Sequence, residues 1–168
     1  MKGSPAMTDV LWPLVYNVIR RNKFSNTIGV FAERASGGHW GRDFYAPKNT
    51  PCYAIADGDI AAIFGTSADT ESFGLVVVLK FKYEHKTLYA AYCPLQKATV
   101  ILNQKAIAAG DEIGYTGNSG NAFNMTGEDE HLHFEIRESV RPPPGSFHRL
   151  SPIKVFKTCP LHLAVVEP

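Results

Sequence analysis

The sequence has few cysteines, no surplus of charge and no long apolar run. Its 168 residues include three cysteines, Cys52, Cys93 and Cys159, which lie far apart and without the spacing of metal ligands. Because an odd number excludes a complete disulfide framework, we expect reduced, partly buried thiols. The 17 basic and 16 acidic residues leave a net charge of +1 with no basic stripe, which argues against nucleic acid as a partner. No apolar run has the length of a transmembrane span.

The first 21 residues, MKGSPAMTDVLWPLVYNVIRR, lack the pattern of a signal peptide. Asp9 and Pro13 interrupt the apolar residues, and a pair of arginines follows them. We therefore expect a chain that is made in the cytoplasm without an export signal of its own. A chain of this length with 45% hydrophobic residues predicts one compact domain. We expect a lead-in over residues 1–26, a main domain over 27–155 and a tail over 156–168.

The distribution of glycine, proline and apolar residues predicts strands. Residues 81–89, FKYEHKTLY, predict a hairpin with Tyr83 to Lys86 as its loop. The segment SPIKVF (151–156) is predicted as a last edge strand, and LWPLVYNVIRR (11–21) as an irregular segment or a short helix after its proline. Short apolar or alternating runs, bounded by Gly, Asp and Asn, cover residues 51–64, 74–92, 106–117 and 131–138. The whole pattern predicts a mainly antiparallel β domain with a groove.

Two histidines, His131 and His133, stand one residue apart in the run EDEHLHFEIR. Side chains alternate along a strand, so both histidines face one side and the apolar residues next to them face the other. Upstream, in GGHWGRDFYAP, His39 and Asp43 are four residues apart. Zinc binds imidazole nitrogen and carboxylate oxygen, and a catalytic zinc site has three protein ligands and a water. His39, Asp43 and one histidine of the pair complete such a set, and the other histidine can take a proton from the water.

Each of these patterns also has a purely structural interpretation. A His-x-x-x-Asp pair by itself is more typical of a surface loop in which the Asp caps a turn. Histidines on a strand that faces a groove are often only hydrogen-bonded. Glu135 and Arg137 are either partners that orient a metal-binding imidazole or an outward cross-strand pair. Trp40 and Phe44 are either groove residues or core residues.

The two segments together resemble a known family. HWGRDFYAPKNTPCYAIADGDI, followed later by GYTGNSGNAFNMTGEDEHLHFEIR, is similar to the lysostaphin/LytM-type zinc endopeptidases, which cleave peptidoglycan cross-bridges and stem peptides. The first segment has the form H-x-G-x-D, the second contains HLHFE, and the resemblance covers residues 12–155. It implies a lysostaphin-like sheet and Zn²⁺ as the cofactor. It also implies that His39, Asp43 and His133 are the zinc ligands and that His131 is a catalytic histidine.

One position departs from the pattern of that family. Relatives carry a further catalytic histidine in a Y-x-H-L segment, where it stabilises charge on the scissile carbonyl oxygen. Here the run is YAAYCPLQ. An alignment on Tyr92 places Pro94 at the histidine, and an alignment on Tyr89 places Ala91 there. Neither side chain donates a hydrogen bond, and loss of such a donor typically lowers turnover about 100- to 1,000-fold.

Four residues are candidates for a substitute donor. Tyr92 has a hydroxyl beside the vacant position, and His85 lies at the far end of the same predicted hairpin. His148 and His162 fall in the C-terminal part, from which a loop can fold back over the groove. For each of them, a solvated or capping side chain is the competing interpretation.

From the resemblance we expect a zinc-dependent endopeptidase that hydrolyses amide bonds in bacterial peptidoglycan. The competing expectation, favoured by the missing histidine, is a catalytically impaired protein that binds peptidoglycan or regulates a partner hydrolase. Because peptidoglycan lies outside the cytoplasmic membrane, we expect an antibacterial effector (a toxin) that a secretion system delivers to the periplasm or cell wall. A cognate immunity protein that plugs the groove is then an expected partner.

Overall fold

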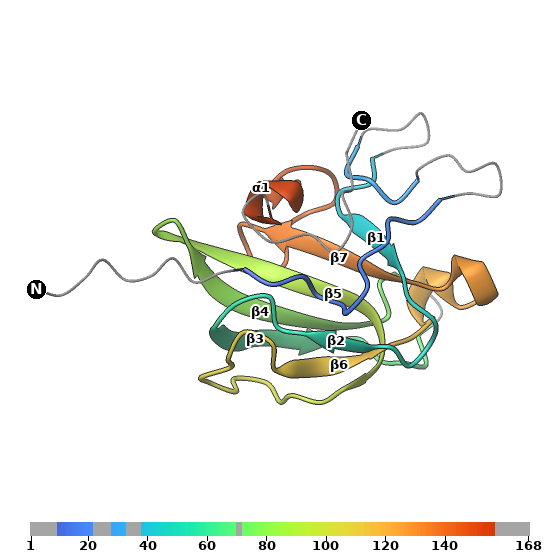
Figure 1. Cartoon of the computed structure of the whole chain (residues 1–168), viewed down its shortest axis with the longest axis horizontal. Coiled ribbons are helices and arrows are strands. Elements are labelled where there is room, and N and C mark those ends of the chain that lie inside the picture. The colour runs from blue at the N-terminus through green and yellow to red at the C-terminus, as the bar shows by residue number, and fades with distance from the viewer. Residues whose placement is uncertain (1–9, 22–27, 33–37, 70–71, 157–168) are drawn as a thin grey trace, which may run out of the picture.

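The computed structural model describes residues 10–21, 28–32, 38–69 and 72–156 and shows a β domain (Figure 1). Every pairing between its strands is antiparallel, which confirms the predicted fold class. One short helix, α1 (Ile153–Phe156), and two 3-10 turns, η1 (Gly120–Ala122) and η2 (Gly127–Asp129), complete the described part. The strands are β1 (Arg42–Tyr45), β2 (Pro51–Tyr53), β3 (Gly58–Phe64), β4 (Leu75–Tyr83), β5 (Lys86–Ala98), β6 (Glu112–Thr116), β7 (His131–Arg137) and β8 (Arg149–Leu150).

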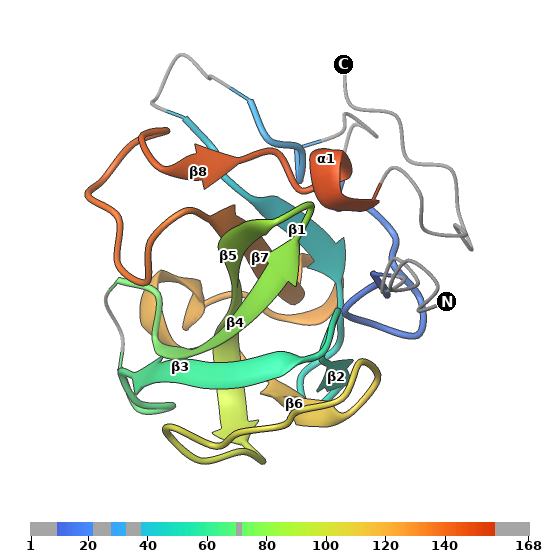
Figure 2. The same ribbon diagram turned by 90° about the vertical axis from the view of Figure 1, so that its left-hand side faces the viewer.

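The sheet is organised around β5. The strand order is β1-β7-β5-β4-β3, and β6 pairs with both β5 and β2. β7 pairs with β5 from Tyr89 to Cys93, and β6 pairs with it from Leu95 to Ala98. The change of partner falls at Pro94, which has no N–H to offer to a ladder. As a result, β7 lies beside the middle of β5, and β6 lies beside its end, with β2 on the other side of β6 (Figure 2).

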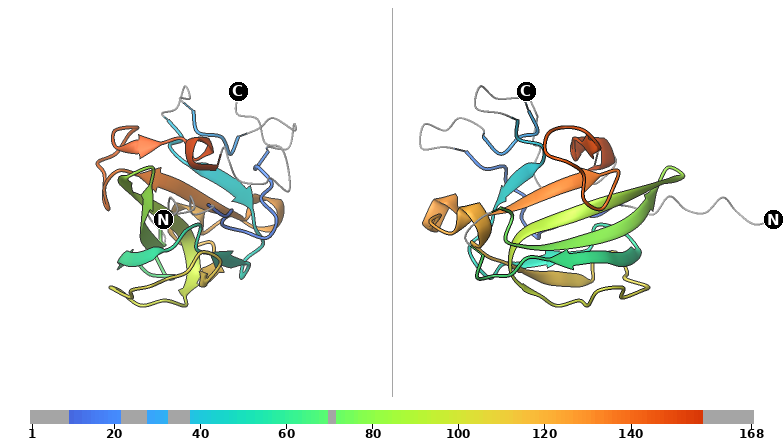
Figure 3. Two further views of the ribbon diagram at one scale, coloured as in Figure 1. Left: turned by 60° about the vertical axis from the view of Figure 1, so that its left-hand side comes forward. Right: turned by 180° about the vertical axis from the view of Figure 1, so that it is seen from behind.

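β4 and β5 form the predicted hairpin. Tyr83 pairs with Lys86 across a two-residue turn, and the turn residues Glu84 and His85 have positive φ angles of 45° and 66°. Positive φ at both central positions is typical of the tight turn whose twist matches that of its strands. The turn lies at the end of the molecule opposite to η1 and η2 (Figure 3).

β7 separates the hydrophobic core from a polar face. Leu132, Phe134 and Ile136 are fully buried in the main hydrophobic cluster, as the alternation predicted. His131 and His133 alternate with these residues and point to the other face, where they line a cavity. Burying each large apolar side chain contributes about 1.5–3 kcal/mol. The core therefore stabilises the one register that presents both histidines to the cavity.

Residues 10–21 form no helix, so the helical alternative for this segment is wrong. Trp12 and Leu14 are buried in the main core. The side chain of Asn17 accepts a hydrogen bond from the N–H of Leu14 (3.0 Å) and donates one to its carbonyl oxygen (2.6 Å). Such local bonds satisfy backbone groups that a helix would otherwise pair. The segment then runs along β1, where Ile19 pairs with Phe44.

The segment SPIKVF contains α1 and not the predicted edge strand. The carbonyl oxygen of Pro152 accepts hydrogen bonds from the N–H groups of Val155 (3.0 Å) and Phe156 (3.1 Å). Proline is favoured at the start of a helix, because its fixed φ suits the first turn. Phe156 stacks on Trp12 with ring centroids 4.0 Å apart, so burial against the lead-in outweighs the strand pattern. The last strand is instead β8, which pairs with β7.

Cys52 and Cys93 are buried free thiols. Burial raises the pKa of the Cys52 thiol to about 12, which makes it unreactive. Cys159 and most of the predicted tail lie outside the described residues. The proposed domain boundaries stay predictions. Within the described ranges, no helix is long and apolar enough to cross a membrane.

Candidate metal centre and active site

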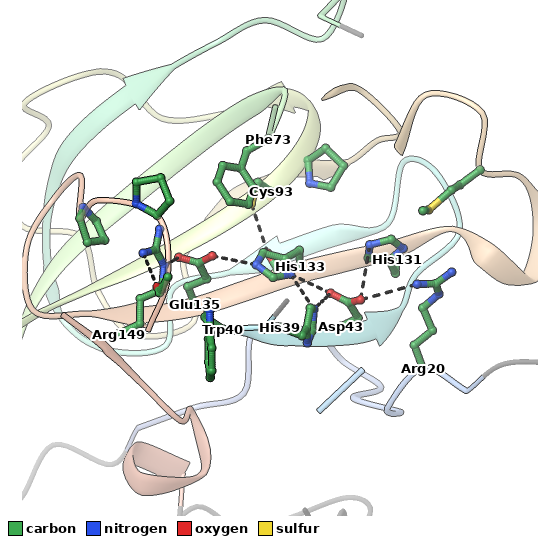
Figure 4. A pocket seen from close by; sticks show the side chains of 16 residues that line it. Arg20, His39, Trp40, Asp43, Phe73, Cys93, His131, His133, Glu135 and Arg149 are labelled. Carbon is green, nitrogen blue, oxygen red and sulfur yellow. Dashed lines mark hydrogen bonds and ion pairs between the residues drawn. The ribbon is translucent and has the colours of Figure 1, made fainter. Parts of the chain in front are cut away.

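Strand pairing brings three polar residues together. β1 and β7 are neighbours, and in their register Asp43 lies opposite His133. His39 lies just before β1, and the Nε2 of its ring is 3.0 Å from the Oδ1 of Asp43. The Nδ1 of His133 is 2.8 Å from the same oxygen and 3.2 Å from the Nε2 of His39 (Figure 4). His39, Asp43 and His133, hereafter the triad, thus direct one potential ligand atom each to a common point.

Gly41 allows the segment between His39 and Asp43 to lie against β7. A Cβ atom at this position would stand 2.7 Å from the carbonyl oxygen of Phe134 and 2.8 Å from the Cε1 of His133. Both distances are too short, so any larger residue would push the turn away from the strand. The glycine of the H-x-G-x-D pattern therefore has a steric role in the site.

Partners on the outer side of each imidazole determine which nitrogen faces the triad. The Nδ1 of His39 lies 2.7 Å from the carbonyl oxygen of Val30, and the Nε2 of His133 lies 2.9 Å from a carboxylate oxygen of Glu135. Both partners accept hydrogen bonds, so each of these nitrogens donates its hydrogen. The inward nitrogens therefore direct their lone pairs toward Asp43. A proton or a metal cation among these atoms is needed to make the arrangement favourable.

This donor set fits zinc. Two imidazole nitrogens and one carboxylate oxygen are typical ligands of catalytic zinc, with a fourth position left open. Hydrogen bonds from the far side of each ring are the usual support of such ligands. Tetrahedral bonds of about 2.1 Å place ligand atoms about 3.4 Å apart. The triad atoms lie 2.8 to 3.2 Å apart, so a small outward movement admits the ion.

The environment of the triad shifts the pKa values of Asp43 and His133 strongly. Burial raises the pKa of the Asp43 carboxyl, but its contacts with the His133 and His39 rings outweigh burial and hold that pKa well below its usual range. Burial lowers the pKa of His133, yet its bonds to Asp43 and Glu135 prevail and raise it to about 9. Without metal, His133 therefore holds a proton at neutral pH, and metal binding must release it.

His131 lies beside the triad but is not part of it. Its Nδ1 donates to the carbonyl oxygen of Asp129 (2.8 Å), so its Nε2 carries a lone pair. That nitrogen is 3.8 Å from the Oδ2 of Asp43, too far for a hydrogen bond. Burial lowers the pKa of His131, which keeps the imidazole neutral at pH 7. A neutral imidazole with a free lone pair is what a general base requires.

Glu135 holds His133 in place and is itself held by two arginines. Its Oε2 accepts hydrogen bonds from the Nε of Arg137 (2.6 Å) and the Nε of Arg149 (2.9 Å). Of the two interpretations of Glu135 and Arg137, the structure shows partners of the imidazole and not an outward pair. No sequence motif marked Arg149, because it reaches the site only through the pairing of β8 with β7.

The triad and His131 line one cavity of about 550 Å³. Trp40 lines it as well, whereas Phe44 is a fully buried core residue. Phe73 covers one face of the His133 ring, with ring centroids 5.7 Å apart. The other lining residues are Arg20, Gly38, Cys93, Pro94, Met125, Glu135, Pro142, Pro144, Gly145 and Arg149.

The structure contradicts two of the candidate substitute donors. Tyr92 points into the core, where its hydroxyl donates to the carbonyl oxygen of Tyr53 (3.0 Å) and accepts from the N–H of Ile55 (3.1 Å). Its bonding capacity is therefore used on the side of β5 that faces away from the cavity. His85 occupies the exposed hairpin turn, about 25 Å along β5 from the residue that pairs with His133. Neither side chain reaches the triad.

Pro94, and not Ala91, lies at the cavity. Pro94 lines it, whereas Ala91 pairs with Glu135 and is buried in a separate small apolar cluster. The structure thus favours the first of the two alignments. His148 is exposed and is not among the lining residues. His162 lies outside the described residues, so its role stays a prediction.

Residues 37–143 match the model of Peptidase family M23. The chain belongs to this family. The M23 chain is 33% identical over 137 residues to the uncharacterized protein Rv3786c of Mycobacterium tuberculosis, a match that covers 72% of this chain and 30% of that protein. It is 32% identical over 104 residues to the DD-carboxypeptidase/endopeptidase Mpg of Neisseria gonorrhoeae, covering 62% of this chain and 21% of Mpg. The chain thus spans less than a third of the length of these relatives.

Solved structures show the same M23 fold. The catalytic domain of the antimicrobial peptidase lysostaphin from Staphylococcus simulans matches with a TM-score of 0.60 at 23% identity, over 78% of this chain and 90% of that domain. A zinc-containing peptidase from Vibrio cholerae matches with a TM-score of 0.52 at 22% identity, over 74% of this chain and 36% of that one. These findings confirm the resemblance seen in the sequence. M23 peptidases depend on zinc as a family, in agreement with the donor set of the triad.

Proposed function

We propose that this M23 chain is a zinc-dependent endopeptidase that hydrolyses amide bonds in the stem peptides or cross-bridges of bacterial peptidoglycan. The observation that carries the proposal is the convergence of three ligand atoms beside the free Nε2 of His131 in one cavity. A metal ligand set and a neutral base that face the same space are what metal-assisted amide hydrolysis requires. The name of the relative Mpg, a DD-carboxypeptidase/endopeptidase, adds support.

Zinc bound by the triad would supply a Lewis acid. The Nε2 of His131 accepts the proton of the attacking water. The hydrogen bond from its Nδ1 to the carbonyl oxygen of Asp129 then stabilises the charged ring. The Oδ2 of Asp43, 3.8 Å from that Nε2, adds a negative charge beside the imidazolium. Glu135 keeps the ring of His133 in the orientation that a metal ligand needs.

Digestion of purified peptidoglycan tests the proposal. The zinc-loaded protein should release new amino termini from peptidoglycan. His131→Ala leaves the triad in place and removes the base, so it should release them about 100- to 10,000-fold more slowly. A zinc-loaded protein that releases no amino termini, at concentrations at which lysostaphin digests its substrate, contradicts the proposal.

The presence of Pro94 in the cavity wall favours a second candidate function. Proline gives the cavity no side-chain donor there, and turnover falls steeply when developing charge is left unpaired. A catalytically impaired protein that binds peptidoglycan or regulates a partner hydrolase needs the cavity but not rapid turnover. Co-sedimentation with peptidoglycan without release of amino termini would support this function over the enzymatic one.

We also propose a setting for the activity. Peptidoglycan lies outside the cytoplasmic membrane, so we propose an antibacterial effector that a secretion system delivers to the periplasm or cell wall, with a cognate immunity protein that covers the cavity. Expression in a bacterium with and without a grafted periplasmic signal tests this setting. Growth should stop only when the signal is present, and equal growth in both cases contradicts it.

A further inference from the structure

Arg20 places a cation in the cavity beside the candidate metal centre. Its Nη1 lies 3.7 Å from the Oδ2 of Asp43, and its Nη2 lies 3.3 Å from the Oδ1 of Asp129. The Nε2 of His131 is 3.8 Å from the same Asp43 oxygen, so the guanidinium and the imidazole both border it. Figure 4 shows Arg20 next to His131, at the end of the cavity opposite to Arg149.

Backbone contacts hold Arg20 in this position. Ile19 pairs with Phe44 on the outer edge of β1, and the N–H of Arg20 donates to the carbonyl oxygen of Asp43 (2.9 Å). Because Ile19 is buried in the core, Arg20 projects to the opposite face, which carries Asp43. Gly29 packs closely against this pair, since a Cβ there would stand 2.5 Å from the Asp43 carbonyl oxygen. Arg20 lies before residues 37–143, the part that matches the family model, and it belongs to neither of the two motifs.

Arg20 has hydrogen-bond donors that the protein leaves unused. Its buried Nε has no hydrogen-bond partner among the described residues. The 3.7 Å separation from Asp43 is too long for a hydrogen bond, and Asp129 is a 64% exposed partner. Arg149, the other arginine of the cavity, directs its Nε to Glu135 and its Nη1 to two backbone carbonyls. Of these two arginines, Arg20 has fewer acceptors in the protein, and it is the one that lies beside His131.

We propose that Arg20 is a catalytic residue whose guanidinium binds the carbonyl oxygen of the scissile amide and stabilises the negative charge that develops there. This inference rests on the proposed hydrolase function. When the water oxygen bonds to the carbonyl carbon, the π electrons move to the carbonyl oxygen and a water proton passes to the Nε2 of His131. That proton then moves to the amide nitrogen as the C–N bond breaks. The remaining hydroxyl proton follows, which leaves a carboxylate and an ammonium group.

Arg20 takes no part in these proton transfers. It contributes hydrogen bonds and positive charge where the oxygen becomes an anion, in a cavity whose wall has no side-chain donor at Pro94. The position of Arg20 beside His131 thus places the donor and the base around the same reacting group.

Kinetics on peptidoglycan peptides provide the first test. Arg20→Met should lower kcat about 100- to 1,000-fold with little change in KM, because the donor acts mainly on the transition state. Arg20→Lys should retain part of the activity, since it keeps the charge and loses the planar fork. Arg21→Met is the matched control, because the side chain of Arg21 is exposed and does not line the cavity. It should leave kcat unchanged. Zinc content should equal that of the wild type in all three variants.

Binding of inorganic phosphate, measured by calorimetry, provides a second test that needs no turnover. Phosphate should bind the zinc-loaded protein more tightly than the zinc-free protein. In zinc-loaded Arg20→Met the affinity should fall at least tenfold, with Arg20→Lys between the two and Arg21→Met unchanged. If the wild type does not cleave peptidoglycan, the proposed function fails, and this measurement then shows only whether Arg20 binds an anion beside the metal centre.

Three results would overturn the inference. One is equal phosphate affinity in Arg20→Met and the wild type. Another is the loss of zinc from both Arg20 variants, which would make Arg20 a structural partner of Asp43. The third is a zinc-loaded wild type that binds no phosphate at all.

Discussion

Glu135 joins the candidate metal centre to the rest of the protein. This carboxylate is 2% exposed and is shared by His133, Arg137 and Arg149. Burial raises the pKa of Glu135, but its charged partners outweigh burial and lower that pKa well below its usual range. The carboxylate therefore stays ionised across the physiological range. A charged carboxylate on the outer nitrogen orients an imidazole ligand and makes it more basic.

The metal content of single alanine variants tests the roles within the site. His39→Ala, Asp43→Ala and His133→Ala should each lose zinc, because two remaining protein ligands leave the ion held mainly by water. His131→Ala should keep nearly stoichiometric zinc, because His131 contributes none of the converging ligand atoms and its Nε2 lies 3.8 Å from the Oδ2 of Asp43. Elemental analysis gives the zinc content, and circular dichroism controls for folding.

Two outcomes of that measurement would contradict these roles. If His131→Ala loses zinc while His133→Ala keeps it, the functions of the two histidines are exchanged. If His39→Ala and Asp43→Ala both keep full zinc, the metal binds elsewhere. The β core should remain folded in all four variants, because a core of this size does not depend on a metal.

Two short elements outside the family match contribute to the core of the domain. The lead-in brings Trp12, and α1 brings Phe156, whose rings stack with centroids 4.0 Å apart. Phe134 of β7 lies 5.7 Å from Phe156 between ring centroids. The core face of the strand that carries both histidines is therefore covered in part by these two elements.

Replacing Phe156 measures how much these elements stabilise the domain. Phe156→Ala should lower the free energy of unfolding by about 3–5 kcal/mol, because it removes a fully buried ring and leaves a cavity. Phe147→Ala is the matched control, since that ring is 65% exposed, and it should change the free energy by less than about 0.5 kcal/mol. Urea unfolding of the zinc-free proteins compares them. Equal effects of the two substitutions would show that α1 does not belong to the core.

At the scale of the whole molecule, the candidate metal centre links folding to proton binding and to zinc binding. Its ligands come from the loop before β1, from β1 and from β7, so they meet only when the sheet has formed. The pKa of His133 in the metal-free protein is raised to about 9, against an ordinary value of 6.5. This raised pKa stabilises the metal-free fold fully below pH 6.5, and the stabilisation disappears as the pH rises through 9.

Zinc affinity should rise with pH, whereas the stability of the metal-free fold falls. Zinc must displace one proton from His133, so its apparent Kd should fall about tenfold per pH unit between pH 7 and pH 9 and then level off. Competition with a chelator of known affinity, repeated across this range, measures the slope. Glu138→Gln, an exposed change at the end of β7, should leave the slope unaltered. A Kd that is independent of pH would show that His133 is already neutral without zinc.

Features that depend on neighbours in the chain could be predicted from the sequence. The alternation of β7 puts its two histidines on one face and its apolar residues in the core, because side chains of a strand alternate whatever it pairs with. The hairpin at Tyr83–Lys86 follows from the lengths and the turn chemistry of its two runs. The donor types of His39 and Asp43 limit the chemistry in the same local way.

Features that depend on pairing between distant segments were decided by the tertiary structure. The register of β1 against β7 puts His133 rather than His131 in the triad. The alternation of side chains along β5 directs Tyr92 into the core. Packing against the lead-in favours a helix, not a strand, in the last apolar run, SPIKVF. Arg20 and Arg149 reach the cavity from segments without a motif, through the pairing of those segments with β1 and β7. Such pairings are set by burial summed over the whole core, which no short stretch of sequence contains.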